Sequence, residues 1–579
     1  TSLNFNPIEK FRAIEFNRNW NLGNQEITTP LFLANVKLGY KKDSLGAVDY
    51  NFDVLDLGEQ FRGFKNNLGL NVDTKKHLVN YTGSLLNSKS DVNTTFYRHK
   101  SNLECRFSKF IIGYRDEAEN NKFMTDSLLG NSYSFYDGKV YLKNKGKKNE
   151  FNLYYGYRNE KTGQNNALSQ SAYSHETGLD YNLISFNKFT QLKGNVAYRK
   201  LVPIDTNNGL TPENTFLNQT NFSTSFLKQL VKLNTFYSIG SGLEQKREFL
   251  YVEVNPGQGV FAWIDYNENG VKELNEFEVA AFADQANFIR VFTQSNEYIK
   301  TYSNRFSQSV SINPYQILKN KEGKFWKFLS KTSSVSAYRV DRKTTKESFE
   351  TSLNPFVNNL EDEGLVSLNK NIFSSLFFNR TGYKYGVELK YEDKSNKILL
   401  SNGFDSRNKE SIGVNLRYKV SRFLLKWENE TGEKTLTSNY LSTRNFSLDY
   451  WKTSPTVTFQ KGINFNWDFM YSYAEKRNKL AGDFASLSTL GTTIKYTVVN
   501  LLNISSSFSF LAIGYTGANN SSLEYEMLEG LKKGNNFTWE LLLNKRVAKN
   551  LDLTLNYNGR KPESIKTIHS GTVQIRAFF

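Results

Sequence analysis

Cysteine, histidine and long apolar runs are scarce in this sequence, and each shortage excludes a class of protein. Cys105 is the single cysteine, so the chain has no disulfide framework and no cysteine-based metal site, and we expect Cys105 to pack as a small apolar residue. No stretch approaches the roughly 18 consecutive apolar residues of a membrane-spanning helix, which excludes a helical membrane protein. Glycine-rich phosphate loops and dinucleotide fingerprints are also missing, so no residues indicate a nucleotide cofactor.

The four histidines form no catalytic arrangement. None has a partner histidine four residues away, and the pair His569 and Ser570 places a histidine beside a nucleophile. Neighbours in a strand point to opposite faces, so these two side chains cannot pair as base and nucleophile without a bulge. We therefore predict that the protein is not an enzyme.

Positive charge is in excess, but it is dispersed. The chain has 74 Lys and Arg against 57 Asp and Glu, a formal net charge of +17. This balance is compatible with nucleic acid, an anionic membrane surface or a lumen that favours anions. Basic clusters beside stacking aromatics in one compact module would indicate nucleic acid, whereas here the charges are spread along the chain. We predict that nucleic acid is not a partner.

Aromatic residues are abundant although hydrophobic residues as a whole are not. Phe, Tyr and Trp make up 15% of the chain and all hydrophobic residues 39%, with a mean hydropathy of −0.56. Apolar and polar residues alternate in many short segments, which predicts strands with one apolar and one polar face. The clearest segments are residues 151–158, 385–392, 412–420, 423–428 and 551–558.

Short and long connections alternate between these segments. Turns fall near residues 420–423, 500–503 and 547–550, and long polar loops at 201–219, 341–370 and 516–536. We predict an all-β fold, a transmembrane antiparallel up-and-down β-barrel of about 24–26 strands with long extracellular loops. At a width on the order of 45–50 Å, its lumen must hold inward-folded loops, a plug, a partner or a transported chain. Expected lumen positions of both charge signs are Glu388, Lys390, Arg417, Lys419, Glu540, Arg546 and Asp552.

The last residues indicate the class of barrel. Val573, Ile575 and Ala577 alternate with the polar residues Thr572, Gln574 and Arg576, and the chain stops on two phenylalanines, of which Phe579 shares their side. This ending resembles the C-terminal strand of bacterial outer-membrane proteins, and with the preceding hairpins it resembles the large outer-membrane barrels of Bacteroidota. The resemblance implies a location in the bacterial outer membrane, recognition of the terminal aromatic by the barrel-assembly machinery, and contact with outer-membrane lipid or lipopolysaccharide.

Residues 265–276 have the spacing of a twelve-residue calcium loop, with glycine at position 6. The predicted Ca²⁺ ligands are the side chains of Asp265, Asn267, Asn269 and Glu276, the carbonyl oxygen of Val271, and Glu273 either directly or through water. The pattern resembles EF-hand and EF-hand-like loops. Lys272 stands at position 8, where paired loops carry an apolar residue, and turn-forming residues at 254–259 replace an entering helix. We expect calcium to brace the loop structurally, followed by a helix over 275–287; the alternative is an Asn/Gly-rich turn without an ion.

These observations suggest two regions and more than one function. Residues 1–24 are a lead-in, and any signal peptide has been removed or lies upstream of Thr1; residues 25–579 are the barrel, in which 255–290 form the extracellular calcium loop and short helix. The first hypothesis is a non-enzymatic subunit of a cell-envelope complex for protein transport, assembly or surface display, with other envelope proteins or lipoproteins as partners. The alternative is a diffusion or uptake pore for polar or anionic solutes.

Overall fold

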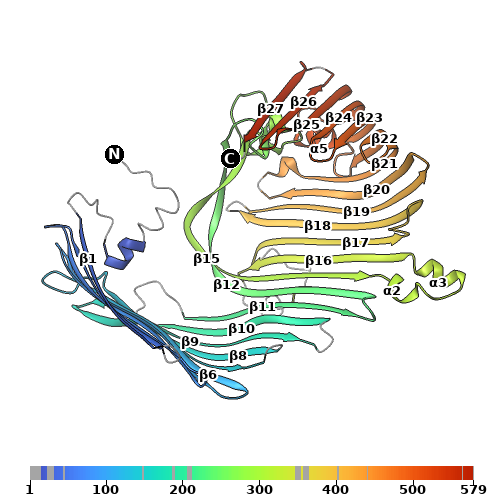
Figure 1. The fold of residues 1–579 in the computed structure, drawn as a ribbon. Helices are drawn as coiled ribbons and strands as arrows, with labels where there is room; N and C mark the ends of the chain where they lie inside the picture. The colour runs from blue at the N-terminus through green and yellow to red at the C-terminus, as the bar shows by residue number, and fades with distance from the viewer. Residues whose placement is uncertain are drawn as a thin grey trace. The chain divides into compact units, whose positions relative to one another are not determined.

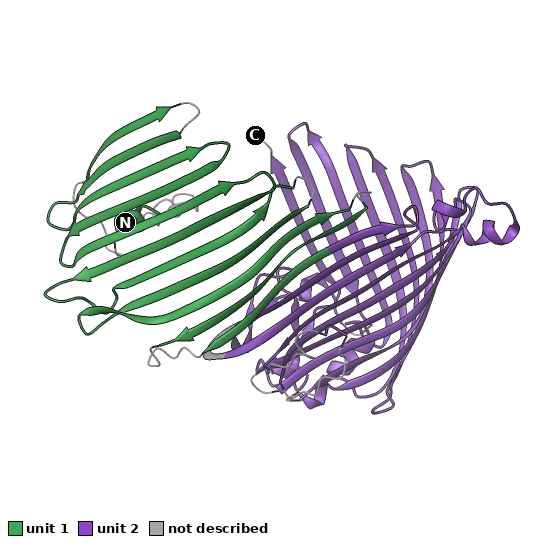
Figure 2. Cartoon of the chain, turned by 90° about the horizontal axis from the view of Figure 1, so that it is seen from below, with its two compact units in different colours: residues 1–221 green, residues 222–579 purple. Residues whose placement is uncertain are grey.

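The computed structural model describes residues 15–22, 31–42, 46–146, 149–185, 189–204, 212–345, 354–356, 364–400, 403–439, 441–563 and 565–577. The chain divides into two compact units, Thr1–Asn221 and Phe222–Phe579 (Figure 2). Most of the predicted lead-in, residues 1–14 and 23–24, and the terminal Phe578 and Phe579 lie outside the described residues.

Unit 1 is a ladder of antiparallel strands in which each strand from β1 to β10 pairs with the next along the chain. Their alternating side chains give each strand two different faces, which is what a half-buried ladder requires. The strands are β1 (Phe32–Lys42), β2 (Gly46–Asp56), β3 (Arg62–Asp73), β4 (His77–Lys89), β5 (Asn93–Arg106), β6 (Phe110–Met124), β7 (Tyr133–Asn144), β8 (Glu150–Gln164), β9 (Ala167–Ile184), β10 (Thr190–Pro203) and β11 (Glu213–Phe226), which ends in unit 2.

Unit 2 continues the same up-and-down order (Figure 1). β12 pairs with β15, and every strand from β15 to β27 pairs antiparallel with the next. The strands are β12 (Val231–Glu253), β15 (Phe288–Ile312), β16 (Thr332–Thr344), β17 (Leu365–Phe378), β18 (Tyr385–Leu400), β19 (Gly403–Val420), β20 (Phe423–Ser438), β21 (Phe446–Lys461), β22 (Phe465–Asn478), β23 (Phe484–Val498), β24 (Leu502–Thr516), β25 (Gly534–Ala548), β26 (Leu551–Lys561) and β27 (Ile568–Ala577).

The predicted fold class, an antiparallel up-and-down β structure of the barrel type, is confirmed. Among the described residues there are 27 strands; β13 (Phe261–Trp263) and β14 (Phe277–Val279) have three residues each, and the other 25 fall within the predicted number. The alternating segments at 385–392, 412–420 and 551–558 lie in β18, β19 and β26. The predicted loops are too long, since β10, β16 and β24 each run into them: backbone pairing continues past the point where side-chain alternation ends.

Register places the side chains of unit 2 on an apolar face and a polar face. On the apolar face, Leu416 lies opposite Trp427, and Leu425 lies opposite Val457. On the polar face, Asn415 lies between Glu388 and Glu428. The predicted lumen residues of both charge signs all fall on this polar face by register: Glu388, Lys390, Arg417, Lys419, Glu540, Arg546 and Asp552.

Each unit has a small apolar core on its polar face, at the end of the strands where the longer loops lie. In unit 1, residues 15–20 form a helical turn whose Trp20 is buried with Leu55, Phe61 and Phe96. Arg18 pairs with Glu119 at 3.2 Å, which ties this turn to β6. In unit 2 the cluster is formed by Leu436, Phe446, Leu448, Ala474, Ala485, Leu487, Ile513, Tyr515, Met527, Leu528 and Leu531.

Helices are few and short. α2 (Tyr315–Leu318) and α3 (Lys324–Leu329) connect β15 to β16, and α5 (Ser522–Met527) connects β24 to β25. In the described part of the chain, no helix has the length and apolar character needed to cross a membrane.

Candidate functional site: the loop on the polar face of unit 2

The predicted calcium loop is carried by the two longest strands. β12 and β15 have 23 and 25 residues and pair along their length, whereas β15 pairs with β16 only from Tyr302 to Ile312. The β12–β15 hairpin therefore extends beyond β16 and, as Figure 1 shows, curves toward the strands at the C-terminal end of unit 2. Residues 254–287, at its tip, are called the tip loop below.

An aromatic cluster closes the base of the tip loop. Strands β13 and β14 pair through Phe261↔Val279 and Trp263↔Phe277. The ring of Phe277 stacks on Tyr251 of β12 at 4.0 Å between centroids and meets Phe288 of β15 at 5.1 Å. Since Phe277 is buried and pairs with Trp263, protein contacts alone hold the two ends of residues 265–276 together.

Glu276 is the most deeply buried carboxylate of the tip loop, with no exposed surface. It accepts hydrogen bonds from Trp263 Nε1 at 2.8 Å and from the backbone N–H groups of Tyr266 and Glu273, both at 3.3 Å. The Glu273 contact is one half of a capping box on the 3-10 turn Leu274–Glu276. These three donors satisfy most of the acceptor capacity of a buried carboxylate.

The first five predicted positions wrap tightly. Gly270 N donates to Asp265 Oδ2 at 2.8 Å, and Asn269 N donates to Asp265 Oδ1 and to Asn267 Oδ1, both at 3.1 Å. Gly270 has φ 73°, a left-handed conformation that glycine adopts without steric cost. The amide groups of Asn267 and Asn269 also reach Glu273, at 3.3 and 3.5 Å.

The structure therefore brings Asp265, Asn267, Asn269 and Glu273 together, and it engages the Glu276 carboxylate with Trp263 and two backbone N–H groups. In the described ranges, no group of three Asp, Glu, His or Cys side chains is close enough to hold a metal ion. The expected helix over 275–287 is wrong: the chain forms a 3-10 turn, strand β14 and the 3-10 turn Ala283–Gln285. The reason is strand pairing, since Phe277 and Val279 alternate with polar residues and pair with β13.

Three contacts attach the tip loop to distant strands and loops of unit 2. Glu278 of β14 pairs with Arg444 at 2.7 Å, and both side chains are buried. Tyr525 of α5 accepts a hydrogen bond from Ala281 N at 2.8 Å. Asp284 pairs with Arg560 of β26, whose guanidinium also lies over the ring of Phe282.

Burial sets the ionisation of the Glu278 site. Loss of solvent raises the pKa of the Glu278 carboxyl, while the charge of Arg444 opposes this shift. Burial, and then the negative charge of Glu278, raises the pKa of Tyr266, whose hydroxyl contacts Glu278 Oε1 at 3.3 Å. Among the groups that favour the charged form of Glu278, Arg444 has the largest effect, and Ser522, Arg407 and Tyr266 add to it.

A polar pocket of about 390 Å³ lies beside this attachment. Glu278, Ser522 and Glu526 line one side of it. The strands supply five cationic side chains, several of them paired with carboxylates, as Lys409 is with Glu430 at 2.9 Å. These cations are Lys370, Lys394, Arg407, Lys409 and Lys434.

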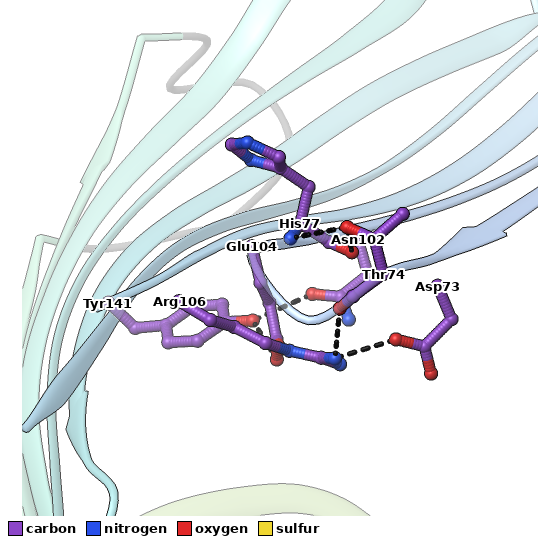
Figure 3. A network of polar contacts seen from close by, with 7 residues as sticks. All are labelled: Asp73, Thr74, His77, Asn102, Glu104, Arg106 and Tyr141. Atoms are coloured by element: carbon purple, nitrogen blue, oxygen red, sulfur yellow. Dashed lines mark hydrogen bonds and ion pairs between the residues drawn. The ribbon is translucent and has the colours of Figure 1, made fainter. Parts of the chain in front are cut away.

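The polar face of unit 1 has its own network near the short-turn end of the strands (Figure 3). Arg106 donates to Asp73 at 2.6 Å and to Glu104 at 3.2 Å, and Tyr141 donates to Glu104 at 3.0 Å. A pocket of about 720 Å³ is lined by Glu104 and Tyr141 among other polar residues. Charged groups of both signs face this space, as in unit 2.

His569 and Cys105 both lie on strands and outside the tip loop. His569 hydrogen-bonds Tyr557 through Nδ1 at 2.8 Å and stacks on its ring, so its contacts are aromatic. Cys105 is exposed, and by register it lies opposite Ile112 on the apolar face of unit 1. Its position beside apolar side chains agrees with the expectation of a small apolar residue, and its side chain is exposed on that face.

The residues that attach the tip loop are not apparent from the sequence. Arg444, Tyr525 and Arg560 stand in segments without a motif, each more than 160 residues from its partner. The one signal is compositional: apolar residues occur on the polar-face register at Leu436, Leu448 and Leu487, which indicates that something covers that end of the strands.

No family model and no curated protein matches this sequence. Solved structures with similar strand arrangements include the FrpB iron transporter from Neisseria meningitidis, at 10% identity and a TM-score of 0.34, covering 87% of this chain and 81% of that one. The copper transporter OprC has 9% sequence identity and a TM-score of 0.32, and the match covers 95% of this chain and 80% of that one. The siderophore receptor PirA from Pseudomonas aeruginosa has 8% sequence identity and a TM-score of 0.29, and the match covers 96% of this chain and 82% of that one. These values are too low to transfer a site or a ligand.

Proposed function

We propose that this chain is the membrane-spanning wall of a bacterial outer-membrane β-barrel and that polar solutes enter along its polar face. The observation that carries the proposal is the exposed apolar face. Large apolar side chains lie next to one another across β18–β22 and remain about half exposed: Leu389, Leu416, Leu425, Trp427, Val457, Trp467 and Phe469.

A water-exposed surface of this kind is not sustainable in a soluble monomer. Contiguous apolar patches larger than a few hundred Å² mark membrane or protein contacts, and each large side chain removed from water contributes about 1.5–3 kcal/mol. The apolar face follows the register from strand to strand, which is how a barrel meets lipid. Trp427 and Trp467 lie within it, and Trp is enriched where barrels meet the membrane interface.

The opposite face supports solute entry. Its side chains are charged or amide-bearing and paired with each other, as in the Lys409–Glu430 and Lys370–Asp393 contacts at 2.9 and 2.8 Å. Such a wall is stable only when hydrated. The formal charge of +17 and the five cations of the unit 2 pocket favour anionic solutes.

Planar-bilayer recording of the purified chain tests this function. We expect stepwise conductance with anion preference, shown by the reversal potential in a salt gradient. Chain that inserts into the bilayer but gives no conductance, with or without the tip loop, would contradict solute entry and leave the membrane location standing.

The second candidate is a non-enzymatic subunit of an envelope complex for protein transport, assembly or surface display. It is favoured by the tip loop and α5, which cover the polar face at the loop end of β20–β26 and would restrict free diffusion. Purification from native membrane distinguishes the two: stoichiometric envelope proteins or lipoproteins support the complex, and an isolated conducting chain supports the pore.

We also propose that the tip loop binds Ca²⁺ as a structural ion. The oxygens of Asp265, Asn267, Asn269 and Glu273 suit a hard dication, with the Val271 carbonyl as a further donor. Glu276 is not free to bind the ion in this conformation, because its carboxylate accepts hydrogen bonds from Trp263 and two backbone amides. It would have to release some of these donors to coordinate Ca²⁺. Calcium bound here would neutralise the acidic turn and order it.

A further inference from the structure

The connection between β15 and β16 differs from its neighbours at the same end of the strands. The connections β19–β20, β23–β24 and β25–β26 are short turns at that end of unit 2. Residues 313–331 instead form helices α2 and α3, which project beyond the strands (Figure 1). The proposed pore uses neither helix.

These helices combine exposed aromatic and cationic side chains. Phe325, Phe328 and Tyr315 are 66%, 55% and 54% exposed, and Trp326 is 37% exposed. Residues 315–331 contain five lysines and one glutamate, a net charge of +4. All five lysines, Lys319, Lys321, Lys324, Lys327 and Lys331, are exposed.

The two kinds of side chain lie side by side on α3. Phe325, Phe328 and Leu329 follow helical spacing, Lys324 and Lys327 flank them, and Lys331 follows the end of the helix. Lys321 Nζ lies over the ring of Trp326 at 4.3 Å, so a cation also stands at the edge of the aromatic group. Exposed aromatic rings beside lysines are typical of segments that lie in a membrane interface.

The aromatic side of α3 is continuous with the apolar face. The ring of Phe328 packs on Phe378 of β17 at 4.8 Å. Phe378 lies opposite Val387, which the register places on the apolar face together with Tyr385. Lys331 Nζ reaches Tyr385 OH at 3.4 Å, so the cationic side begins where the apolar face ends.

From this continuity and the charge, we propose that α2 and α3 form an interfacial anchor that binds anionic phospholipid headgroups of the leaflet at the short-turn end. The aromatic rings enter the acyl boundary, and the lysines extend to the phosphates. The inference rests on the proposed membrane-spanning function. A protein partner could use the aromatic rings, but would not require them to continue into the lipid-facing surface.

The test uses the full chain in vesicles of mixed phosphatidylcholine and phosphatidylglycerol, with bromine on the acyl chains of one lipid or the other. Bromine quenches nearby tryptophan, and the emission of Trp326 is taken as the difference between the parent and Trp326→Phe. Trp467 on the apolar face, measured through Trp467→Phe, is the matched control. A third variant replaces Lys319, Lys321, Lys324 and Lys327 with glutamine.

We expect brominated phosphatidylglycerol to quench Trp326 more than brominated phosphatidylcholine does, and the lysine variant to abolish this difference while Trp467 responds equally to both lipids. Quenching of Trp467 without quenching of Trp326 would overturn the anchor and leave the membrane wall intact. Equal quenching of Trp326 by both lipids would overturn recognition of anionic lipid. If neither tryptophan is quenched, the proposed membrane function itself fails.

Discussion

The buried Arg444–Glu278 pair gives the sharpest test of how the tip loop is held. Both side chains are 8% exposed, and Arg444 also contacts Ser522 of α5 at 3.4 Å. The variant Arg444→Met keeps most of the side-chain volume and leaves Glu278 as a buried charge without its cation. Breaking a buried pair in this way costs about 3–5 kcal/mol.

That cost falls on the attachment of the tip loop and leaves the strand ladder largely unaffected. At about 1.4 kcal/mol per tenfold change, the equilibrium for release of residues 254–287 should shift by roughly two to three and a half powers of ten. Hydrogen–deuterium exchange of peptides from this segment measures the shift. The double variant Arg444→Met/Glu278→Gln is the matched control, because it removes the unpaired charge and should recover much of the lost protection.

The loss of exchange protection in Arg444→Met should depend on pH. Burial raises the pKa of Glu278, and loss of Arg444 removes the largest of the interactions that oppose this rise. A carboxyl with a raised pKa in the folded state stabilises that state most below its unfolded pKa, near 4.3, and the stabilisation is lost as pH rises through the folded value. Protection in Arg444→Met should therefore improve as pH falls. Equal exchange in parent and variant, or no pH dependence in the variant, would refute the reasoning.

Two further predictions concern the apolar face and the calcium loop. Phe469→Lys should cost up to about 2–4 kcal/mol in a urea titration of chain folded in vesicles, whereas Met470→Lys on the adjacent polar position should cost little; equal effects would contradict a lipid-facing surface. Asn269→Ala should increase protease cleavage between Leu250 and Ser295 more with calcium than with chelator, because it removes a ligand in addition to the hydrogen bond from Val271 N. Glu276→Gln should increase cleavage to a similar extent in both conditions, because the hydrogen bonds of Glu276 hold the turn with or without the ion. Identical digestion of parent and Asn269→Ala in both conditions would remove the metal proposal.

The sequence was sufficient to predict the strands and their two faces. Alternation is a local property with a period of two residues, so residues 412–420 and 551–558 indicate β19 and β26 without knowledge of their neighbours. The spacing of Asp265, Asn267, Asn269 and Gly270 likewise predicts a tight wrap, since each contact joins residues at most five positions apart. Strand ends and the helix over 275–287 were not predicted correctly, because pairing with a partner strand decided both.

Tertiary structure alone decided where the tip loop lies and what Glu276 does. Glu278 meets Arg444 across 166 positions and Asp284 meets Arg560 across 276, and no local pattern encodes such pairs. Glu276 has the spacing of a calcium ligand, yet its carboxylate takes the indole N–H of Trp263, because pairing of β13 with β14 brings that ring beside it. The sequence determines what each residue can donate, accept or bury; only the folded chain determines which partner is within reach.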